Sequence, residues 1–317
     1  MITNFNSNRK ELASKIDFEN LLNKLEQAFK GLKEQLTIQP EQTALIAPNG
    51  DDCIIYAAAD FANHLVGVKL SPYVAGRTSQ NLNAVTAYTF LISMKTGEPI
   101  IVCDSFNLTA MRTAATSILA ISKLKPTQKK LAVIGFGPIG QEHLRWALVK
   151  FKWETVSIFS PKISIDKKIA IEKINENNLN PKNYAIEFAE NLDMAVDDAD
   201  VIMLCTSSKT EILDLSKTKS ECIITSIVTN SPTAHEVKPI SLKECDVYCD
   251  FLPNSLTVAG EFKLLNEQGE LSNLNIKGDL SDLCNWDFEN NVNPNSRRYF
   301  RSVGLGIEDI VIANSLL

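Results

Sequence analysis

The chain has 317 residues, enough for two domains that each bury a core of their own. A hydrophobic content of 44% and a charged content of 22% are ordinary for a globular protein, and the formal net charge of −6 argues against a nucleic-acid-binding function. The first residues are polar and no apolar run reaches membrane-spanning length, so we expect a cytoplasmic protein with small-molecule partners and no membrane contact. Seven cysteines, an odd number found mostly in apolar runs, indicate reduced thiols and no metal site.

The first part of the chain is predicted to form a helix followed by a sheet. Leucines at helical spacing follow Asp17, a residue suited to cap a helix. Four strand-like runs come next, at residues 52–60, 64–70, 84–94 and 99–104. The segment "KTGE" between the last two is typical of a hairpin turn, so we expect a mostly antiparallel sheet. A second helix is expected over about residues 108–124, with Pro126 ending it.

A glycine-rich turn follows the apolar run at residues 131–134. Three glycines have the G-x-G-x-x-G spacing, in which the first permits a tight turn, the second admits a pyrophosphate and the third allows close helix packing. A helical pattern begins directly afterwards, so its free N–H groups could hold a phosphate. The context favours a dinucleotide site over a purely structural corner. The residues expected to bind the cofactor there are Gly135, Gly137, Pro138, Ile139 and Gly140.

From Leu131 onward, strand-like runs alternate with helical or short connecting segments, which is typical of a doubly wound parallel sheet. Six runs carry this pattern: residues 131–135, 155–159, 185–189, 200–205, 222–227 and 246–250. A domain boundary is therefore expected near residues 112–128. Residues beyond about 252 are polar and suggest a loop region, whereas the apolar segment 303–317 predicts a helix that packs back on the first domain.

Two charged side chains lie where apolar neighbours are expected. Arg112 lies on the apolar face of its helix, and an unpaired buried charge there costs several kcal/mol. It is either an arginine that binds a carboxylate through its fork, or one that reaches solvent or pairs with Asp104. Lys69 has Gly67 as its neighbour on the same strand face, so it is either a pocket residue or a solvated strand-end lysine.

The end of the second parallel strand bears on the choice of cofactor. An acidic residue there would accept hydrogen bonds from the ribose 2′-OH of NAD, but this chain has Ser160, followed by Lys162. A hydroxyl and a nearby cation suit a 2′-phosphate, which favours NADP(H) over NAD(H). The alternative is that Lys162 and Lys167 are simply solvated. The three histidines of the chain are assigned no catalytic role.

Four segments resemble, in order and spacing, the ornithine cyclodeaminase and mu-crystallin family: "GVKLSPYVAG", "KTGEPIIVCDSFNLTAMRTAATSILA", "LAVIGFGPIGQEHL" and "RSVGLGIEDIVIA". The resemblance runs from about residue 18 to residue 317, and "LTAMRTAA" is its most specific part. It implies a homodimer. It also implies an α+β substrate-binding and dimerisation domain of residues 1–112, completed by residues 300–317, and a Rossmann dinucleotide-binding domain of residues 113–299.

The resemblance implies roles for individual residues. Lys69 and Arg112 would hold the substrate carboxylate, and Thr113 would lie near the cofactor. The turn at Val303 and Gly304 would line the nicotinamide pocket, with Gly304 on the substrate side.

Two positions depart from the family pattern. Gln42 stands where the family often has an arginine, which removes one candidate carboxylate contact. Asn230 stands where cyclodeaminases carry an aspartate, whereas Glu236 of the same segment is kept. An amide cannot take a proton from a substrate amine as a carboxylate can, so cyclodeamination is disfavoured.

We therefore predict an NAD(P)H-dependent reductase, or dehydrogenase in reverse, for the C=N or CH–NH bond of a small α-imino or α-amino acid. A cyclic ketimine and an opine-like amine are candidate substrates, and Lys69, Arg112 and Asn230 are the candidate catalytic residues. One alternative is an ornithine cyclodeaminase that forms proline and ammonia. The other is a non-catalytic, mu-crystallin-like protein that binds NADP(H) and a small ligand. Retention of both Lys69 and Arg112 favours an enzyme.

Overall fold

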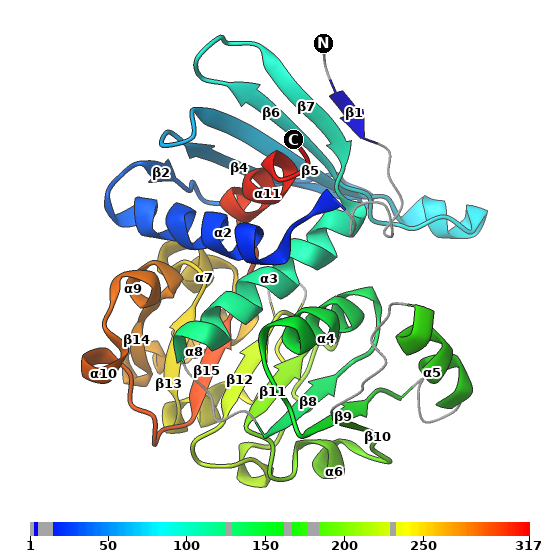
Figure 1. Ribbon diagram of the computed structural model, residues 1–317, viewed down its shortest axis with the longest axis vertical. Coiled ribbons are helices and arrows are strands. Elements are labelled where there is room, and N and C mark those ends of the chain that lie inside the picture. The colour runs from blue at the N-terminus through cyan, green and yellow to red at the C-terminus, as the bar shows by residue number, and fades with distance from the viewer. Residues whose placement is uncertain (1–2, 6–14, 125–128, 162–166, 177–183, 229–232) are drawn as a thin grey trace. The chain divides into compact units, whose positions relative to one another are not determined.

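The computed structural model describes residues 3–5, 15–124, 129–161, 167–176, 184–228 and 233–317 (Figure 1). The fold is mixed α/β, as predicted, and the chain divides into two compact units. The first unit runs up to Arg112 and also contains Gly304–Leu317, and the second is Thr113–Val303. Each unit is built around one sheet.

The first unit contains a seven-stranded sheet with the order β1-β7-β6-β5-β4-β2, in which β3 also pairs with β4. Its strands are β1 (Thr3–Phe5), β2 (Thr37–Ile38), β3 (Thr43–Ile46), β4 (Asp52–Asp60), β5 (Leu65–Tyr73), β6 (Tyr88–Ser93) and β7 (Pro99–Asp104). All neighbours pair antiparallel except β1 and β7. The predicted antiparallel sheet and the hairpin at "KTGE" are thus confirmed. A 3-10 helix, η1 (Ala75–Gln80), follows β5.

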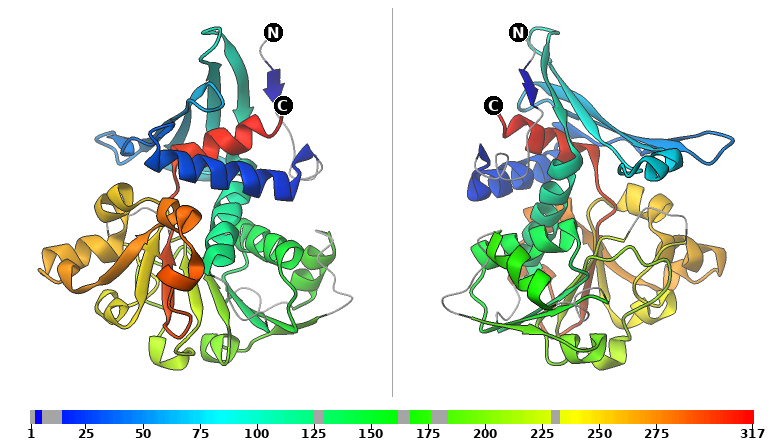
Figure 2. Two further views of the ribbon diagram at one scale, coloured as in Figure 1. Left: turned by 60° about the vertical axis from the view of Figure 1, so that its left-hand side comes forward. Right: turned by 90° about the vertical axis from the view of Figure 1, so that its right-hand side faces the viewer.

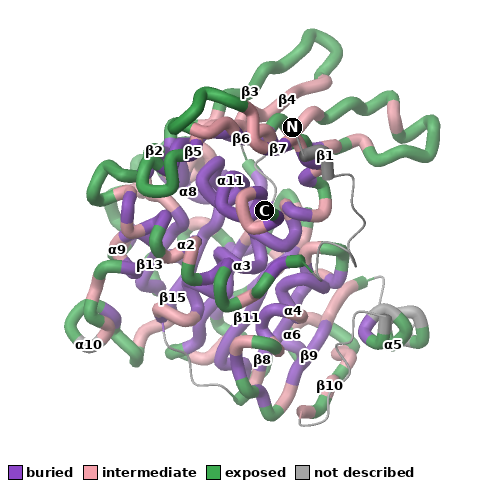
Figure 3. The backbone as a smooth tube through the Cα atoms, turned by 45° about the horizontal axis from the view of Figure 1, so that its top comes forward, coloured by how far each residue is buried: buried purple, intermediate pink, exposed green. Residues whose placement is uncertain are grey.

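Two helices, α2 (Phe18–Lys33) and α11 (Gly306–Asn314), pack on one face of this sheet (Figures 1 and 2). Asp17 caps α2 as predicted, because its carboxylate accepts a hydrogen bond from Asn20 N at 2.6 Å. Helix α11 contacts α2 and strands β4, β5 and β6, and it is buried through its first eight residues (Figure 3). The predicted C-terminal helix therefore completes the core of the first unit.

The second unit contains an eight-stranded, fully parallel sheet with the order β10-β9-β8-β11-β12-β15-β13-β14. Its strands are β8 (Lys130–Ile134), β9 (Thr155–Phe159), β10 (Ala185–Phe188), β11 (Val201–Leu204), β12 (Ile223–Ser226), β13 (Asp246–Cys249), β14 (Asn275–Asp279) and β15 (Arg298–Arg301). The six predicted runs all form strands of this sheet. The strand order reverses between β8 and β11, and open parallel sheets bind ligands at such a point.

The helices of this part of the chain are α4 (Pro138–Lys150), α5 (Lys167–Glu176), α6 (Leu192–Val196), α7 (Leu252–Val258), α8 (Gly260–Glu267), α9 (Leu280–Asn285) and α10 (Phe288–Asn291). Three short 3-10 helices accompany them: η2 (Leu215–Lys217), η3 (Pro239–Glu244) and η4 (Leu271–Asn273). The predicted long helix is α3 (Phe106–Leu124), which crosses the division between the two units. Pro126, expected to end it, lies outside the described residues.

The loop region expected beyond residue 252 was a wrong prediction. Residues 252–302 hold four α-helices, one 3-10 helix and two strands, and β15 inserts between β12 and β13 in the parallel sheet. Arg298 and Arg301 made this strand hard to predict from the sequence, because a strand buried in a parallel sheet is normally an apolar run. Both are buried in the structure, where Arg301 Nε lies 2.8 Å from Glu261 and Arg298 donates hydrogen bonds to backbone carbonyl groups.

Candidate functional site

The glycine-rich turn joins β8 to α4 in the second unit. Gly135 has φ of +92°, a conformation that favours glycine, and its N–H donates a hydrogen bond of 2.8 Å to Phe159 O. A methyl group on Gly140 would overlap the carbonyl oxygen of Gly135. Gly137 differs, because a methyl group there would meet no protein atom within 4 Å. The first and third glycines therefore serve the fold, and the second leaves room for a ligand.

A cavity of about 630 Å³ opens at this turn, beside the carboxyl ends of β8, β9, β11 and β12. Its lining residues are Ile134, Gly135, Phe136, Gly137, Pro138, Ile139, Phe159, Ser160, Pro161, Leu192, Cys205, Thr206, Ser207, Ser208, Ile212 and Ile227. The lining is mostly apolar, with the backbone of the turn and several hydroxyl groups on it. This arrangement fits a dinucleotide whose pyrophosphate lies at the start of α4.

The structure places most of the expected cofactor residues at this cavity. The turn residues other than Gly140 line it, and Ser160 lines it after the end of β9. Gly140 packs α4 against the turn instead. Lys162 lies outside the described residues, as does Asn230.

Thr206, which follows β11 and lines the cavity, was not predicted from the sequence. Its N–H and Oγ1 donate hydrogen bonds of 3.0 and 2.6 Å to Glu236 Oε1, and Ser226 Oγ donates one of 2.7 Å to Oε2. Burial raises the pKa of Glu236, and these hydrogen bonds oppose the rise. Glu236 thus ties together the segments that follow β11 and β12. The sequence could have predicted this role for Thr206, since a polar residue directly after a buried parallel strand lies at the binding edge of the sheet.

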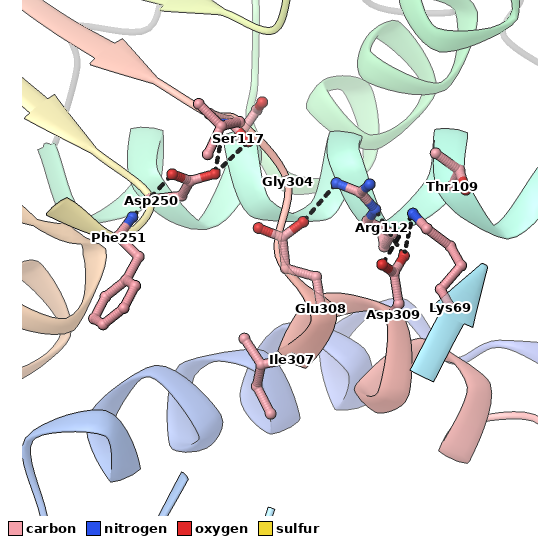
Figure 4. A network of polar contacts seen from close by, with 12 residues as sticks. Lys69, Thr109, Arg112, Ser117, Asp250, Phe251, Gly304, Ile307, Glu308 and Asp309 are labelled. Atoms are coloured by element: carbon pink, nitrogen blue, oxygen red, sulfur yellow. Dashed lines mark hydrogen bonds and ion pairs between the residues drawn. The ribbon is translucent and has the colours of Figure 1, made fainter. Parts of the chain in front are cut away.

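Lys69 lies on β5 in the first unit and is 1% exposed, so it is not a solvated strand-end lysine. Its Nζ is 3.0 Å from Asp309 Oδ1 and 2.9 Å from Asp309 Oδ2 (Figure 4). The ammonium also lies over the ring of Tyr56 on β4, 4.1 Å from the ring centroid.

Arg112 is buried as predicted and points into the same polar cluster (Figure 4). Its Nε donates a hydrogen bond of 3.0 Å to Asp309 Oδ1, and its Nη1 donates one of 2.7 Å to Glu308 Oε2. The alternative pairing with Asp104 is wrong, because Asp104 instead accepts a hydrogen bond from Phe106 N at the start of α3. Asp309 therefore bridges the two cations that the sequence had singled out.

The cluster joins two cations to two carboxylates. Burial lowers the pKa of Lys69 to about 8, Arg112 adds to this effect, and Asp309 opposes it. Burial disfavours the charged form of Arg112 too, but Asp309 and Glu308 together raise its pKa above the ordinary value. The Nη2 group of Arg112 donates to no described residue of the first unit. Acids thus hold Nε and Nη1 of the guanidinium, which leaves Nη2 as the nitrogen that could donate to a ligand.

The backbone of Gly304 lies against this guanidinium. Gly304 has φ of +78°, and a methyl group on it would lie 2.5 Å from Arg112 Nη1 and 2.8 Å from Nη2. Gln42, which departs from the family pattern, donates a hydrogen bond of 3.0 Å to Gly304 O. The amide at position 42 therefore supports the turn that begins the C-terminal segment.

Val303, in the second unit, is held by Asp250, whose Oδ2 accepts hydrogen bonds of 2.6 Å from Val303 N and 3.1 Å from Ser302 Oγ. Thr113 is buried in α3. The expected places of Val303 and Thr113 at the nicotinamide stay predictions.

His143 is buried within the second unit and faces no solvent. Its ring bonds Ile139 O and Ser117 Oγ, and burial lowers its pKa to about 4. It holds α4 to α3 within this unit. All seven cysteines are free thiols, as expected.

Within the described residues, no group of three or more histidine, cysteine or acidic side chains could hold a metal ion. In the same part of the chain, no helix has the length and apolar character needed to cross a membrane.

The fold and the glycine turn define a Rossmann-type dinucleotide-binding protein with a buried cluster of two cations and two carboxylates in its other unit. Residues 4–316 match the ornithine cyclodeaminase/mu-crystallin family. The chain belongs to this family, as the sequence segments predicted.

Named relatives span nearly the whole chain. An NAD(P)H-dependent anabolic L-arginine dehydrogenase of Pseudomonas aeruginosa is 37% identical over 96% of this chain and 93% of the relative. A Delta(1)-pyrroline-2-carboxylate reductase of Colwellia psychrerythraea is 24% identical over 95% of both chains. A solved structure of Thermococcus litoralis Delta(1)-pyrroline-2-carboxylate reductase with NADH and L-proline has a TM-score of 0.83 and 20% identity, over 97% of this chain and 94% of that one.

Proposed function

We propose that the protein is an NAD(P)H-dependent dehydrogenase or reductase that interconverts an α-imino acid and an α-amino acid. The observation that carries this proposal is the pair of buried cations, Lys69 and Arg112, which acids hold in place beside Gly304. A pair of this kind suits a small carboxylate ligand. The dinucleotide turn and the two oxidoreductase relatives support the redox chemistry.

Arg112 and Lys69 would act on the substrate through their charged N–H groups. Arg112 would donate from Nη2 to the substrate carboxylate, and Lys69 would provide a further charged donor. Bound NAD(P)H supplies the hydride that reduces the α-carbon. In the reductive direction, an α-imino acid, NAD(P)H and a proton give an α-amino acid and NAD(P)⁺. Lys69, whose pKa of about 8 lies near neutrality, could hold or release that proton at Nζ.

For the substrate, we propose first the α-imino form of a basic amino acid such as arginine, in line with the 37% identical relative. Pyrroline-2-carboxylate is the second candidate, in line with the 24% identical relative. An amide such as that of Asn230 could not act as a base, which disfavours cyclodeamination of ornithine.

The experiment is a panel assay of NADPH and NADH oxidation. The panel contains the α-keto acid of arginine with ammonia, pyrroline-2-carboxylate, and linear imino acids formed from other α-keto acids and amines. We expect oxidation with at least one imino acid, and no ammonia from ornithine. Proline and ammonia from ornithine, with no imine reduced, would establish the cyclodeaminase alternative. Cofactor binding without turnover of any compound would favour the binding-protein alternative.

We further propose a preference for NADP(H), because Ser160 occupies the position where an acidic residue would bind the ribose of NAD. Ser160→Asp would repel the 2′-phosphate and offer hydrogen-bond acceptors to a 2′-OH. The ratio of the NADPH and NADH dissociation constants should therefore shift toward NADH by about tenfold or more. Fluorescence titration of both cofactors measures the ratio, with Ser208→Asp on the same cavity as the control. Equal wild-type affinities would contradict the preference.

We also propose a homodimer through the first unit's sheet. Val68, Phe90 and Val102 are aligned across β5, β6 and β7, and none of the three is buried. The adjacent pair Leu70 and Tyr88 is 43% and 51% exposed. The opposite face carries Lys69 and is the one that α11 packs on. An apolar sheet face of this size suits a second copy of the chain.

Phe90→Asp should convert this dimer to a monomer, because the introduced charge would be buried without a partner at the interface. Light scattering at micromolar concentration measures the mass. Phe61→Asp is the control, since Phe61 is an exposed aromatic residue that follows β4 and is not among the residues aligned across β5, β6 and β7. A wild-type monomer would contradict the proposal.

A further inference from the structure

We propose that Asp309 is the positioning residue of the substrate site: its single carboxylate holds the Lys69 ammonium and the Arg112 guanidinium side by side for one substrate carboxylate. This inference rests on the proposed function, because it assigns a purpose to the cations through the ligand that they would share. It concerns the C-terminal helix, to which neither the sequence pattern nor the family resemblance gave a catalytic part.

The geometry singles out this residue. Asp309 is 1% exposed and uses both carboxylate oxygens, one bonded to Lys69 and Arg112 together and the other in contact with Lys69. The cations come from β5 and α3, and the carboxylate comes from α11. One side chain thus joins three elements of the first unit at the place where the two cations meet.

Glu308, the preceding residue, has a narrower part. Its Oε2 is bonded to Arg112 Nη1 at 2.7 Å, and no hydrogen bond to Lys69 is formed. Both acids therefore orient the guanidinium, but Asp309 alone also binds the ammonium. Substituting either residue by its amide removes one buried negative charge from the same helix, so the two variants are matched controls for each other.

The surroundings of Lys69 indicate what this carboxylate does. The charged and titratable groups that face its ammonium are Tyr56 on β4, Arg112 on α3, and Glu308 and Asp309 on α11, while Cys103 on β7 lies on the same sheet face beyond Thr89. Burial and Arg112 both disfavour the protonated amine, and Asp309 is the main group that favours it. Removing Asp309 would leave Lys69 neutral over more of the pH range, and a neutral amine attracts a carboxylate weakly.

The test measures carboxylate binding without turnover. The complex of the full-length protein with NADP⁺ is titrated with 2-furoate, a planar carboxylate with no group that titrates between about pH 6 and about pH 10. In the wild type, we expect affinity to fall as the pH rises through about 8, because Lys69 then loses its charge. Asp309→Asn should move this midpoint down by about one pH unit or more, which is the effect expected for loss of an opposite charge in contact.

Two further variants separate positioning from general damage. Glu308→Gln should weaken binding at every pH but move the midpoint by less than half as much, because it acts on Arg112. Asp104→Asn, which neutralises an acid at the start of α3 and can still accept the bond from Phe106, should change neither quantity. A purely structural role for Asp309 would lower the melting temperature and leave the midpoint in place, and that result would overturn the inference.

A second variant decides the matter if Asp309→Asn does not fold. In Lys69→Gln, the loss of affinity at alkaline pH should disappear, and its persistence would overturn the inference. Failure of the proposed function is seen separately, as the lack of any NAD(P)H oxidation across the imino acid panel. Normal turnover with an unmoved midpoint in Asp309→Asn would refute only the inference.

Discussion

Arg112→Ala is expected to lower kcat/KM for the imino acid by about 10²-fold or more, mainly through KM. Truncating one partner of a buried, hydrogen-bonded charge pair costs about 2–5 kcal/mol of binding, and each 1.4 kcal/mol corresponds to a factor of ten. The side chain is 4% exposed, and Asp309 and Glu308 hold its Nε and Nη1, so Nη2 is preorganised to donate to a carboxylate. Alanine supplies no donor to replace it.

The same substitution should destabilise the first unit. It removes the cation that the two buried carboxylates share, and breaking a buried ion pair costs about 3–5 kcal/mol of folding free energy. Arg112→Lys keeps the charge but loses the planar fork. It should fold better than Arg112→Ala and still raise KM. Steady-state kinetics, circular dichroism and NADPH titration distinguish the two effects. An unchanged KM in a folded Arg112→Lys protein would show that the carboxylate binds elsewhere.

The second large effect is expected at the glycine turn. Alanine at Gly140 should reduce stability, whereas alanine at Gly137 should reduce only cofactor binding. Gly140→Ala would drive a methyl group into the carbonyl oxygen of Gly135, and backbone cannot move aside cheaply. We expect a loss of at least about 2 kcal/mol of stability, together with loss of measurable dinucleotide binding. Gly137→Ala meets no protein atom within 4 Å, so it should keep the wild-type melting temperature.

Gly137→Ala should nevertheless weaken NADPH binding by about tenfold or more, because the methyl group would occupy the space left for the pyrophosphate. Thermal melting without cofactor and fluorescence titration with it make up the measurement, and the two variants serve as controls for each other. If Gly137→Ala binds NADPH as tightly as the wild type, the turn is a structural corner and the dinucleotide lies elsewhere.

Local patterns in the sequence were sufficient for the elements that the nucleotide site needs. The run at residues 131–134, the three spaced glycines and the helical pattern after them predicted β8, the turn and α4, because each depends on neighbours within about one turn or one strand. Ser160 was found in the same way, as the residue at the end of a recognisable strand. The strand β15 was not, since Arg298 and Arg301 interrupt its apolar character and their partners lie far away in the sequence.

The sequence by itself determined that Arg112 and Lys69 are charged side chains among apolar neighbours, and that each therefore needs an opposite charge or a binding pocket. Only the tertiary structure decided which partner, because Asp309 lies 197 residues after Arg112 and 240 after Lys69. The segment "GLGIEDIVIA" reads as an apolar helix with two acids, and nothing in its own spacing says that those acids face inward. They do so because α11 packs between α2 and the sheet, where the desolvation of two cations can be offset only by carboxylates at the same place.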